Sequence, residues 1–587
     1  METKPDYPES EASSSSSYYH SASKVKIFFM VFTLSILSWV STLNSTVSST
    51  TIEPIGLELG TNNLQWVSHS YMLTNTALQP VWGKLSDYFG RLILLKIAIY
   101  VFMIGSMVVA FSNTLSVLIV GRTIMGVASG VLQVIAIVIL SDLIPIRQRG
   151  KYLGFMSAAN LFGMSLGPLW GAIISKSIGW RWTAVLNVPI LFIASNMVLF
   201  FIFIPAPPGS FKKKVVRIDF LGIILAVLAA GVFLAAFDII GGVQRLPSIL
   251  SIIFVVIGVV LAIVFIINEK KTKKDPLISY KVLQEHNVWI GFLSAIATGV
   301  VIYATLFTLP SFYRVITRNP DLAAEAKIWP WTVGVVISTV VCGISMTVYG
   351  NYKPYLVIGG IMMICGLTWL SLVNPGSNLI HSYLGSFLIG LGIGFRVPSV
   401  TIEAQCVVKY QDLASTTALI NFARNVGGVI GMTSANQMLK YRFMDKVSTL
   451  AKENPEWESQ LLLVSEGIIS ALWQVEDEEV KEKTLEAFAK TVNFIFYYCI
   501  FFSCIGFVLS LVTKKVKLLD EFDSDESHAP DLEQSKDEES VVGDEVKNKS
   551  ETVEPNTVLD STKGSSPTET IVVSPTKLAK HETVTES

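Results

Sequence analysis

The sequence contains fourteen stretches of about 20 mainly apolar residues each, the length of helix that crosses the apolar core of a bilayer. With 51% hydrophobic and 16% charged residues, the chain is too apolar for ordinary soluble domains. We therefore expect an all-α polytopic membrane protein with 14 transmembrane helices. The predicted spans cover residues 25–47, 65–85, 94–111, 115–140, 152–173, 182–204, 220–240, 249–267, 288–309, 328–349, 355–373, 383–404, 416–438 and 492–512.

Both ends of the chain are polar. Residues 1–24 are rich in serine, and residues 513–587 are acidic with interspersed Ser, Thr and Pro. Such segments bury too little apolar surface to fold, so we predict that both are disordered. The N-terminus lacks the basic start and short apolar core of a signal peptide, so the first span is expected to remain as an anchor.

Basic residues concentrate in alternate loops. One set of loops carries clusters such as Arg147, Arg149 and Lys151, whereas the opposite set is poorer in basic residues. Because basic loops stay in the cytosol, and an even number of spans returns the chain to its starting side, we predict that both termini are cytosolic. Residues 439–490 would then form a long loop on the luminal or external side.

The link after the second span carries an acid, a base and two glycines, namely Gly83, Asp87, Gly90 and Arg91. We expect a tight turn at the membrane face, in which the glycines let two helices reverse. Asp87 could accept hydrogen bonds from helix N-terminal amides, and Arg91 could grip a carboxylate with two hydrogen bonds. An ordinary charged turn that only fixes orientation is the alternative.

The form G-x-L-x-D-x-x-G-R of this link resembles the signature loop between spans 2 and 3 of the major facilitator superfamily. The resemblance implies a cytosolic latch that opens and closes as two halves of a transporter rock. It also implies two six-helix bundles, at residues 25–204 and 288–512, related by an axis along the membrane normal. Residues 205–287 would form a linker with two inserted helices. A second, degenerate latch is expected at residues 350–353.

Two further span motifs resemble the same superfamily. Arg122 lies within apolar sequence in R-x-x-x-G, similar to a proton-linked motif of span 4; reaching to the membrane interface is its alternative role. Span 5 carries a glycine motif in which residues four apart form one stripe for close helix packing. Its full spacing, with proline, resembles the antiporter motif; it consists of Gly154, Gly163, Gly167, Pro168 and Gly171.

Residues 179–182, Gly-Trp-Arg-Trp, resemble the start of span 6 in the fourteen-span drug:proton antiporter branch. Residues 43–47, 65–66 and 73–80 look most like the fungal vacuolar basic amino acid transporters. These relatives usually have an aspartate in span 1 where this chain has Asn44. An amide neither titrates nor pairs with a cation, so the span-1 substrate or ion position is altered.

The remaining candidates for proton-linked or cavity positions are ionisable residues inside predicted spans: Asp238, Arg396, Glu403 and Arg424. Arg396 and Glu403 are seven residues apart and share one helical face. An additional intramembrane cation suits a cationic substrate poorly unless an acid neutralises it. Ionisable groups within a membrane mark functional positions because they are costly to bury there.

The resemblance implies a proton-coupled antiporter that moves basic amino acids from the cytosol into the vacuole. Efflux of drugs or other organic compounds at the plasma membrane is the first alternative, and a non-transporting nutrient sensor is the second. We expect a monomeric transport unit whose partners are a small-molecule substrate, protons and the bilayer. The sequence shows no set of nucleophile and base, metal cluster or phosphate loop. We therefore expect no enzymatic activity and no cofactor, metal or nucleic-acid partner.

Overall fold

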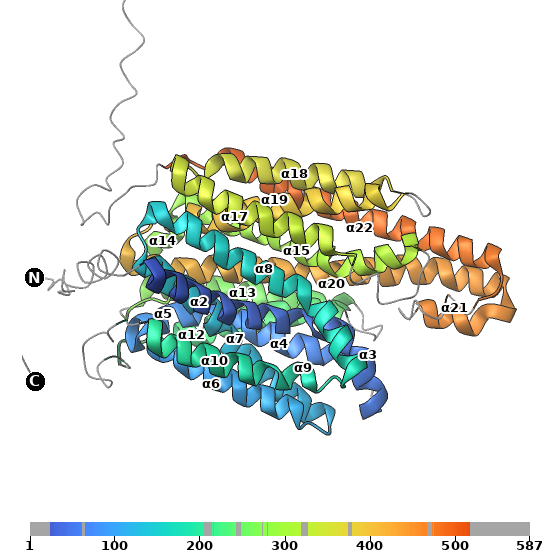
Figure 1. Cartoon of the computed structure of the whole chain (residues 1–587), viewed down its shortest axis with the longest axis horizontal. Helices are drawn as coiled ribbons and strands as arrows, with labels where there is room; N and C mark the ends of the chain where they lie inside the picture. The colour runs from blue at the N-terminus through green and yellow to red at the C-terminus, as the bar shows by residue number, and fades with distance from the viewer. Residues whose placement is uncertain are drawn as a thin grey trace, which may run out of the picture. The chain divides into compact units, whose positions relative to one another are not determined.

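The computed structural model describes residues 24–60, 65–202, 204, 214, 216–241, 248–272, 274–278, 280–317, 327–373, 378–465, 472 and 475–516 (Figure 1). Within these residues the regular elements are helices, as the sequence predicts. Eleven of the described helices are long and apolar enough to cross a membrane. The predicted disorder of residues 1–24 and 513–587 falls almost wholly outside the described residues.

Eleven of the fourteen predicted spans coincide with a described helix that is long and apolar enough to cross a membrane, and three do not. The run 65–85 is divided at Leu78 into α4 (Gln65–Ala77) and α5 (Gln79–Phe89), because Pro80 lies in the first turn of α5. The run 220–240 lies in α12 (Phe220–Gly241), whose described apolar part is shorter than the other spans. The run 416–438 lies in the more polar α20 (Leu413–Glu453). A total of 14 spans therefore stays a prediction.

The N-terminal half packs around α7 and α8. Helix α2 packs on both α7 and α8, while α6 and α4 pack on α7, and α10 packs on α2 and α6. Small residues allow these close contacts, since a Cβ at Gly121 of α7 would meet the backbone of Val109 in α6 at 2.9 Å. The helices of this half are α2 (Lys24–Thr46), α3 (Ser48–Leu59), α4, α5, α6 (Arg91–Ala110), α7 (Leu115–Leu143), α8 (Ile146–Ser177), α9 (Trp182–Val185) and α10 (Asn187–Phe201).

The C-terminal half repeats this packing in the same order. Helix α15 packs on α20 as α2 packs on α8, and α17 and α18 pack on α19 as α4 and α6 pack on α7. Helix α22 contacts α15 and α18, as α10 contacts α2 and α6. The helices are α15 (His286–Thr317), α17 (Trp329–Tyr349), α18 (Lys353–Ser371), α19 (Leu379–Gln405), α20 and α22 (Glu478–Val512), with the short α14 (Tyr280–Gln284) before them.

The two halves meet chiefly along two helix pairs, α8 with α17 and α5 with α20. Helix α12 packs on α13 (Ser248–Lys271), and α12 also contacts α4 and α20. The segment that links the two halves therefore forms a helix pair, which lies next to the contact between α5 and α20.

The segment 439–490, expected to form a long luminal or external loop, is helical over much of its described length. The side of the membrane on which it lies stays a prediction. Helix α20 continues to Glu453, α22 begins at Glu478, and α21 (Glu458–Ser465) packs on α20 (Figure 1). Apolar residues recur along these extensions and bury one another. Phe443 of α20 and Phe488 of α22, for example, pack edge to face with ring centroids 5.1 Å apart.

Candidate functional site

The stretch 83–91 is mostly helix rather than the turn predicted for it. Residues 83–89 form the last turns of α5, and α6 begins at Arg91. Gly90 alone reverses the chain, with φ of 97°, a conformation that favours glycine. The prediction of a longer turn is wrong because nothing between Pro80 and Gly90 stops the helix. Gly83 instead serves close packing, since a Cβ there would lie 2.8 Å from the carbonyl oxygen of Ala414 in α20.

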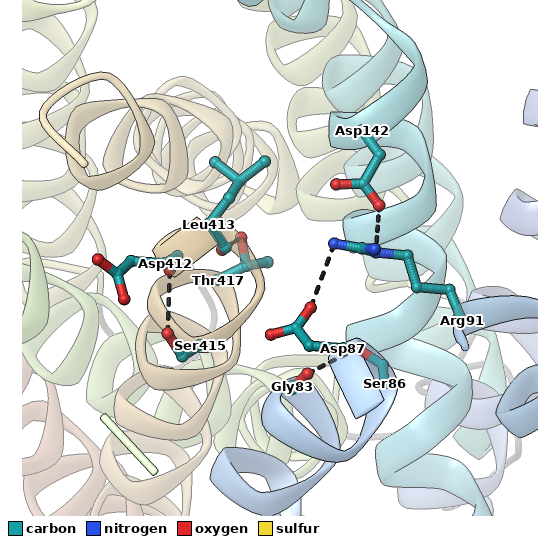
Figure 2. A network of polar contacts seen from close by, with 9 residues as sticks. All are labelled: Gly83, Ser86, Asp87, Arg91, Asp142, Asp412, Leu413, Ser415 and Thr417. Atoms are coloured by element: carbon teal, nitrogen blue, oxygen red, sulfur yellow. Dashed lines mark hydrogen bonds and ion pairs between the residues drawn. The ribbon is translucent and has the colours of Figure 1, made fainter. Parts of the chain in front are cut away.

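Arg91 holds two carboxylates at this end of the N-terminal half. Its Nη2 donates to Asp87 Oδ1 at 3.2 Å, and its Nε forms an ion pair with Asp142 at the end of α7. Figure 2 shows the Asp87 carboxylate between Arg91 and the first turns of α20, where Leu413 and Thr417 lie. The helix N-terminus of α20 carries partial positive charge, which favours an acid beside it. The network thus lies where α5, α6, α7 and α20 meet.

The Asp87 side chain keeps 25% of its surface exposed. Burial of the remainder raises the pKa of its carboxyl to about 7, and this effect exceeds the opposite influence of Arg91 and Lys84. Asp142, which completes the network, was not among the residues predicted from the sequence. A single acid that ends an apolar run, after Ser141, was the available signal.

The C-terminal half has a related arrangement without its charges. Gly350 ends α17 with φ of 63°, as Gly90 ends α5. Thr347 stands three residues before this glycine, as Asp87 does before Gly90. The Thr347 hydroxyl oxygen accepts a hydrogen bond of 2.9 Å from the backbone N–H of Lys151, in the second turn of α8. A neutral hydroxyl here takes the place of the acid, and the second latch stays a prediction.

A narrow cavity of about 30 Å³ lies between the two halves. Its lining comes from α2, α7 and α8 of one half and from α15, α19 and α20 of the other. It holds about one or two water molecules, whereas sites for organic ligands usually enclose about 300–1,000 Å³. The lining residues are Ser38, Thr42, Gln133, Ile137, Leu153, Met156, Ser157, Asn160, Leu161, Met164, Ile302, Tyr303, Val397, Thr401, Asn421, Arg424 and Asn425.

Of the predicted proton-linked or cavity residues, Arg424 lines this cavity. Its guanidinium donates to Asn421 Oδ1 at 3.1 Å and to Thr401 Oγ1 at 3.2 Å. The next residue, Asn425, is 8% exposed, and no hydrogen bond is described for its Nδ2. These polar side chains were not predicted from the sequence, except for Arg424 itself, because the uncharged ones resemble ordinary helix-packing residues.

Arg122 and Asn44 lie together inside the N-terminal half rather than on the cavity. Arg122 Nη1 donates to the Asn44 carbonyl oxygen at 3.3 Å. The Asn44 amide exchanges hydrogen bonds of 2.9 and 3.0 Å with the amide of Asn187 in α10. Asn44 was expected at a substrate or ion position, but the cavity residues of α2 are Ser38 and Thr42. Thr42 and Ser38 lie two and six residues before Asn44, about 200° and 240° around the helix, so Asn44 faces away from the cavity and joins α2 to α10.

Arg396 and Glu403 are buried within the C-terminal half. The Arg396 guanidinium donates four hydrogen bonds to neutral oxygens, namely those of Thr298 and Ser294 in α15, the Leu356 carbonyl in α18 and the Gly506 carbonyl in α22. Glu403 Oε1 accepts from Thr513 Oγ1 at 2.7 Å, and no hydrogen bond is described for its Oε2. Neither side chain lines the cavity. The side chain of Asp238 lies outside the described residues.

The glycine motif divides between two partners. Gly163 and Gly167 face α2, and Gly171 faces the junction of α2 and α3. A Cβ at Gly167 would collide with Thr46 Oγ1 and lie 2.8 Å from the Leu43 carbonyl oxygen. Gly154 instead faces the other half, since a Cβ there would lie 2.8 Å from the Thr339 carbonyl oxygen in α17. Pro168 lies inside α8, and its carbonyl oxygen accepts a hydrogen bond of 2.8 Å from Thr50. Gly427 and Gly431 of α20 pack against α15 in a similar way.

Comparison with known proteins supports the same architecture. The protein is similar in structure to the proton:xylose symporter XylE bound to 6-bromo-6-deoxy-D-glucose. The TM-score is 0.55 at 15% sequence identity, over 84% of this chain and 98% of the symporter. A likeness at this level of identity describes the fold.

Similar sequences come from fungi. The chain is 29% identical over 432 residues to the "Efflux pump dotC" of Dothistroma septosporum, covering 73% of this chain and 74% of the pump. It is 27% identical over 536 residues to the "MFS-type transporter gkaD" of Penicillium citrinum, covering 89% of this chain and 91% of that protein. The names of these relatives favour the efflux alternative over vacuolar transport of amino acids. Residues 34–432 match the profile described as Major Facilitator Superfamily, and the chain therefore belongs to this superfamily of membrane transporters.

Proposed function

We propose that this protein exports small organic compounds from the cytosol in exchange for protons. The observation that carries the proposal is the position of the cavity: both halves line it, and both halves also close together at the end where the latch lies. A cavity of about 30 Å³ admits an organic solute only when the halves separate. Alternating separation at the two ends would move the solute across the membrane.

The network of Asp87, Arg91 and Asp142 would respond to the separation of the two halves. Asp87 and Arg91 belong to the N-terminal half, and Asp87 lies beside the N-terminus of α20 in the C-terminal half (Figure 2). Separation at this end would remove the favourable helix terminus from Asp87 while its pairing with Arg91 persists. The relative named an efflux pump supports export from the cytosol as the direction.

Transport of basic amino acids into the vacuole has less support. A cationic substrate would require an acid in the cavity, but the charged side chain among the described lining residues is Arg424. A sensor that does not transport is the remaining alternative from the sequence. The small-residue contacts of α5 with α20 and of α8 with α17 favour halves that move against each other instead.

Reconstitution of the full chain into sealed vesicles tests the proposal. We would impose an acidic interior and measure the accumulation of a panel of organic dyes and of radiolabelled lysine, with and without a protonophore. We expect accumulation of dyes that stops when the pH gradient is collapsed and that is lost in Arg91→Ala. Gradient-driven accumulation of lysine alone would restore the vacuolar alternative, and no flux of any compound would favour the sensor.

A further inference from the structure

We propose that the cavity binds the carboxylate, or a similar singly charged group, of an organic anion through Arg424 and Asn425. This inference rests on the proposed function and names the chemical class of its substrate. It starts from charge, because Arg424 is the charged side chain among the described residues that line the cavity. The site that opens between the halves is therefore cationic.

Arg424 has hydrogen-bonding capacity left for a ligand. A guanidinium has five N–H donors, and the described hydrogen bonds of Arg424 are two, both to the neutral oxygens of Asn421 and Thr401. Arg396, by contrast, is 1% exposed and makes four hydrogen bonds that join helices away from the cavity. The difference separates an arginine that holds helices together from one that faces the space between the halves.

Asn425 supplies a second hydrogen-bond donor next to Arg424. Asn425 is 8% exposed, lines the cavity, and has no described partner for its Nδ2, while its Oδ1 accepts from Tyr303 at 3.5 Å. A buried amide N–H₂ without an acceptor destabilises the site, and an oxygen of a ligand would remove that cost. A carboxylate has two oxygens and several lone pairs, so one group can accept from both Arg424 and Asn425.

The remainder of the lining favours an organic anion over a small inorganic one. Met156 and Met164 of α8 and Ile302 of α15 supply apolar surface next to the polar side chains. Methionine side chains adapt to apolar groups of different shape. A ligand with a carboxylate at one end and an apolar body would match both parts of this surface.

The same surface disfavours cations. A positively charged ligand would approach Arg424 without a described acid in the cavity lining to neutralise either charge. Like charges placed together in a site of low polarity repel strongly, and such repulsion is a common source of selectivity. The cavity thus selects by charge as well as by shape.

Matched ligands can test this inference by binding alone. The probes are 2-naphthoate, the neutral 2-naphthamide and the cation of 2-(aminomethyl)naphthalene, which share one aromatic body. We would measure the dissociation constants of the purified full chain at pH 7 from ligand-dependent shifts of Tm. We expect naphthoate to bind about tenfold to a hundredfold more tightly than naphthamide, as a charge-assisted hydrogen bond implies, and the cation to bind most weakly.

Variants connect the preference to Arg424. We expect Arg424→Gln to remove the preference for naphthoate while binding of naphthamide stays within about threefold, and Arg424→Lys to retain part of the preference. Arg396→Gln, which removes a buried guanidinium away from the cavity, is the matched control and should keep the ratio of the wild type. Equal or weaker binding of naphthoate, or a preference that survives in Arg424→Gln, overturns the inference.

Vesicle transport separates this outcome from failure of the proposed function. Proton-driven flux of neutral or cationic compounds without a binding preference for naphthoate would leave export intact and reject the anion site. Preferential binding of naphthoate without any proton-driven flux would support the site and reject export.

Discussion

Gly83 of α5 and Ala414 of α20 hold the two halves in direct backbone contact at the latch end, since a Cβ at position 83 would lie 2.8 Å from the Ala414 carbonyl oxygen. The contact at Gly343 of α17 is similar, with a Cβ position 2.4 Å from the Gly150 carbonyl oxygen of α8. Both pairs combine small residues, so the halves can approach closely without interlocking side chains. Such surfaces can part and meet again.

We expect Gly83→Ala to slow transport at least about tenfold while the protein is still made and inserted in normal amounts. The added methyl group forces α5 and α20 apart, so the conformation closed at the latch end loses stability, and a cost of about 1.4 kcal/mol already shifts such an equilibrium tenfold. Initial rates of dye uptake into vesicles measure the effect. Gly231→Ala is the matched control, because Gly231 lies in α12 and has no atom within 4 Å of its Cβ position. Equal rates in both variants would contradict the prediction.

The pair of Arg91 and Asp142 gives a second prediction. The Asp142 side chain is 5% exposed and that of Arg91 is 18% exposed, so removal of Arg91 leaves the Asp142 charge in a poorly hydrated site, and removal of Asp142 leaves Arg91 with Asp87. We expect Asp142→Asn to lower the free energy of unfolding by about 3 kcal/mol. Arg91→Gln combined with Asp142→Asn should cost less than the sum of the single changes. Equilibrium unfolding in mixed detergent micelles provides the values, and strict additivity would mean that the two side chains do not interact.

We also expect Asp87→Ala and Arg91→Ala to abolish transport in protein that still folds, although Arg91→Ala also lowers the free energy of unfolding because Asp142 loses this partner. Each change removes one member of the network but leaves the packing of α5 against α20 in place. Dye flux is compared with the amount of correctly localised, monodisperse protein. Wild-type rates in either variant would refute the assignment of these residues as a latch.

The raised pKa of Asp87 predicts how stability depends on pH. The pKa rises from an ordinary value of 3.8 to about 7 in the folded protein, chiefly through burial. Between these values the folded state binds more protons than the unfolded state, so this residue's contribution to stability is complete below about pH 4 and is lost as the pH rises through 7. Relative to Asp87→Asn, the wild type should therefore lose Tm between pH 4 and 7. Parallel Tm profiles of the two proteins would contradict the shift.

Much of this site could be predicted from local sequence. Asp87 and Arg91 are four residues apart and pair across one turn, so the motif itself contains the interaction. The glycine motif likewise predicts a smooth helix face, whichever helix covers it. What these signals share is that the relevant geometry is set within one helix or one turn.

The parts that were missed or wrong depend on which face of a helix meets which neighbour. Asp142 is distant from Arg91 in sequence, and no spacing rule joins them. Asn44 faces Asn187, whereas Ser38 and Thr42, on nearly the opposite side of the same helix, face the cavity. For the segment 439–490 the sequence predicts a loop between spans, but which apolar residues of α20, α21 and α22 pack together depends on helix faces that sequence spacing does not define.

The division of the glycine motif between two partners allows the roles of its residues to be separated. Gly167 packs on α2 within one half, where a Cβ would collide with Thr46 Oγ1, so Gly167→Val should reduce both the stability of the protein and exchange. Gly154 packs on α17 of the other half, where a Cβ would lie 2.8 Å from the Thr339 carbonyl oxygen. Gly154→Ala should therefore slow transport with a smaller change in Tm.

The physical reason is that packing within a half persists through the transport cycle, whereas packing between the halves is broken and remade in it. A steric change within a half destabilises every conformation, while one between the halves destabilises only the conformation closed at the latch end. Measuring Tm and vesicle flux for Gly167→Val and Gly154→Ala side by side distinguishes the two cases. If Gly154→Ala lowers Tm as much as Gly167→Val does, the halves do not separate along α8 and α17. Unaltered proton-driven flux in Gly167→Val would remove the argument that the glycine motif marks an antiporter.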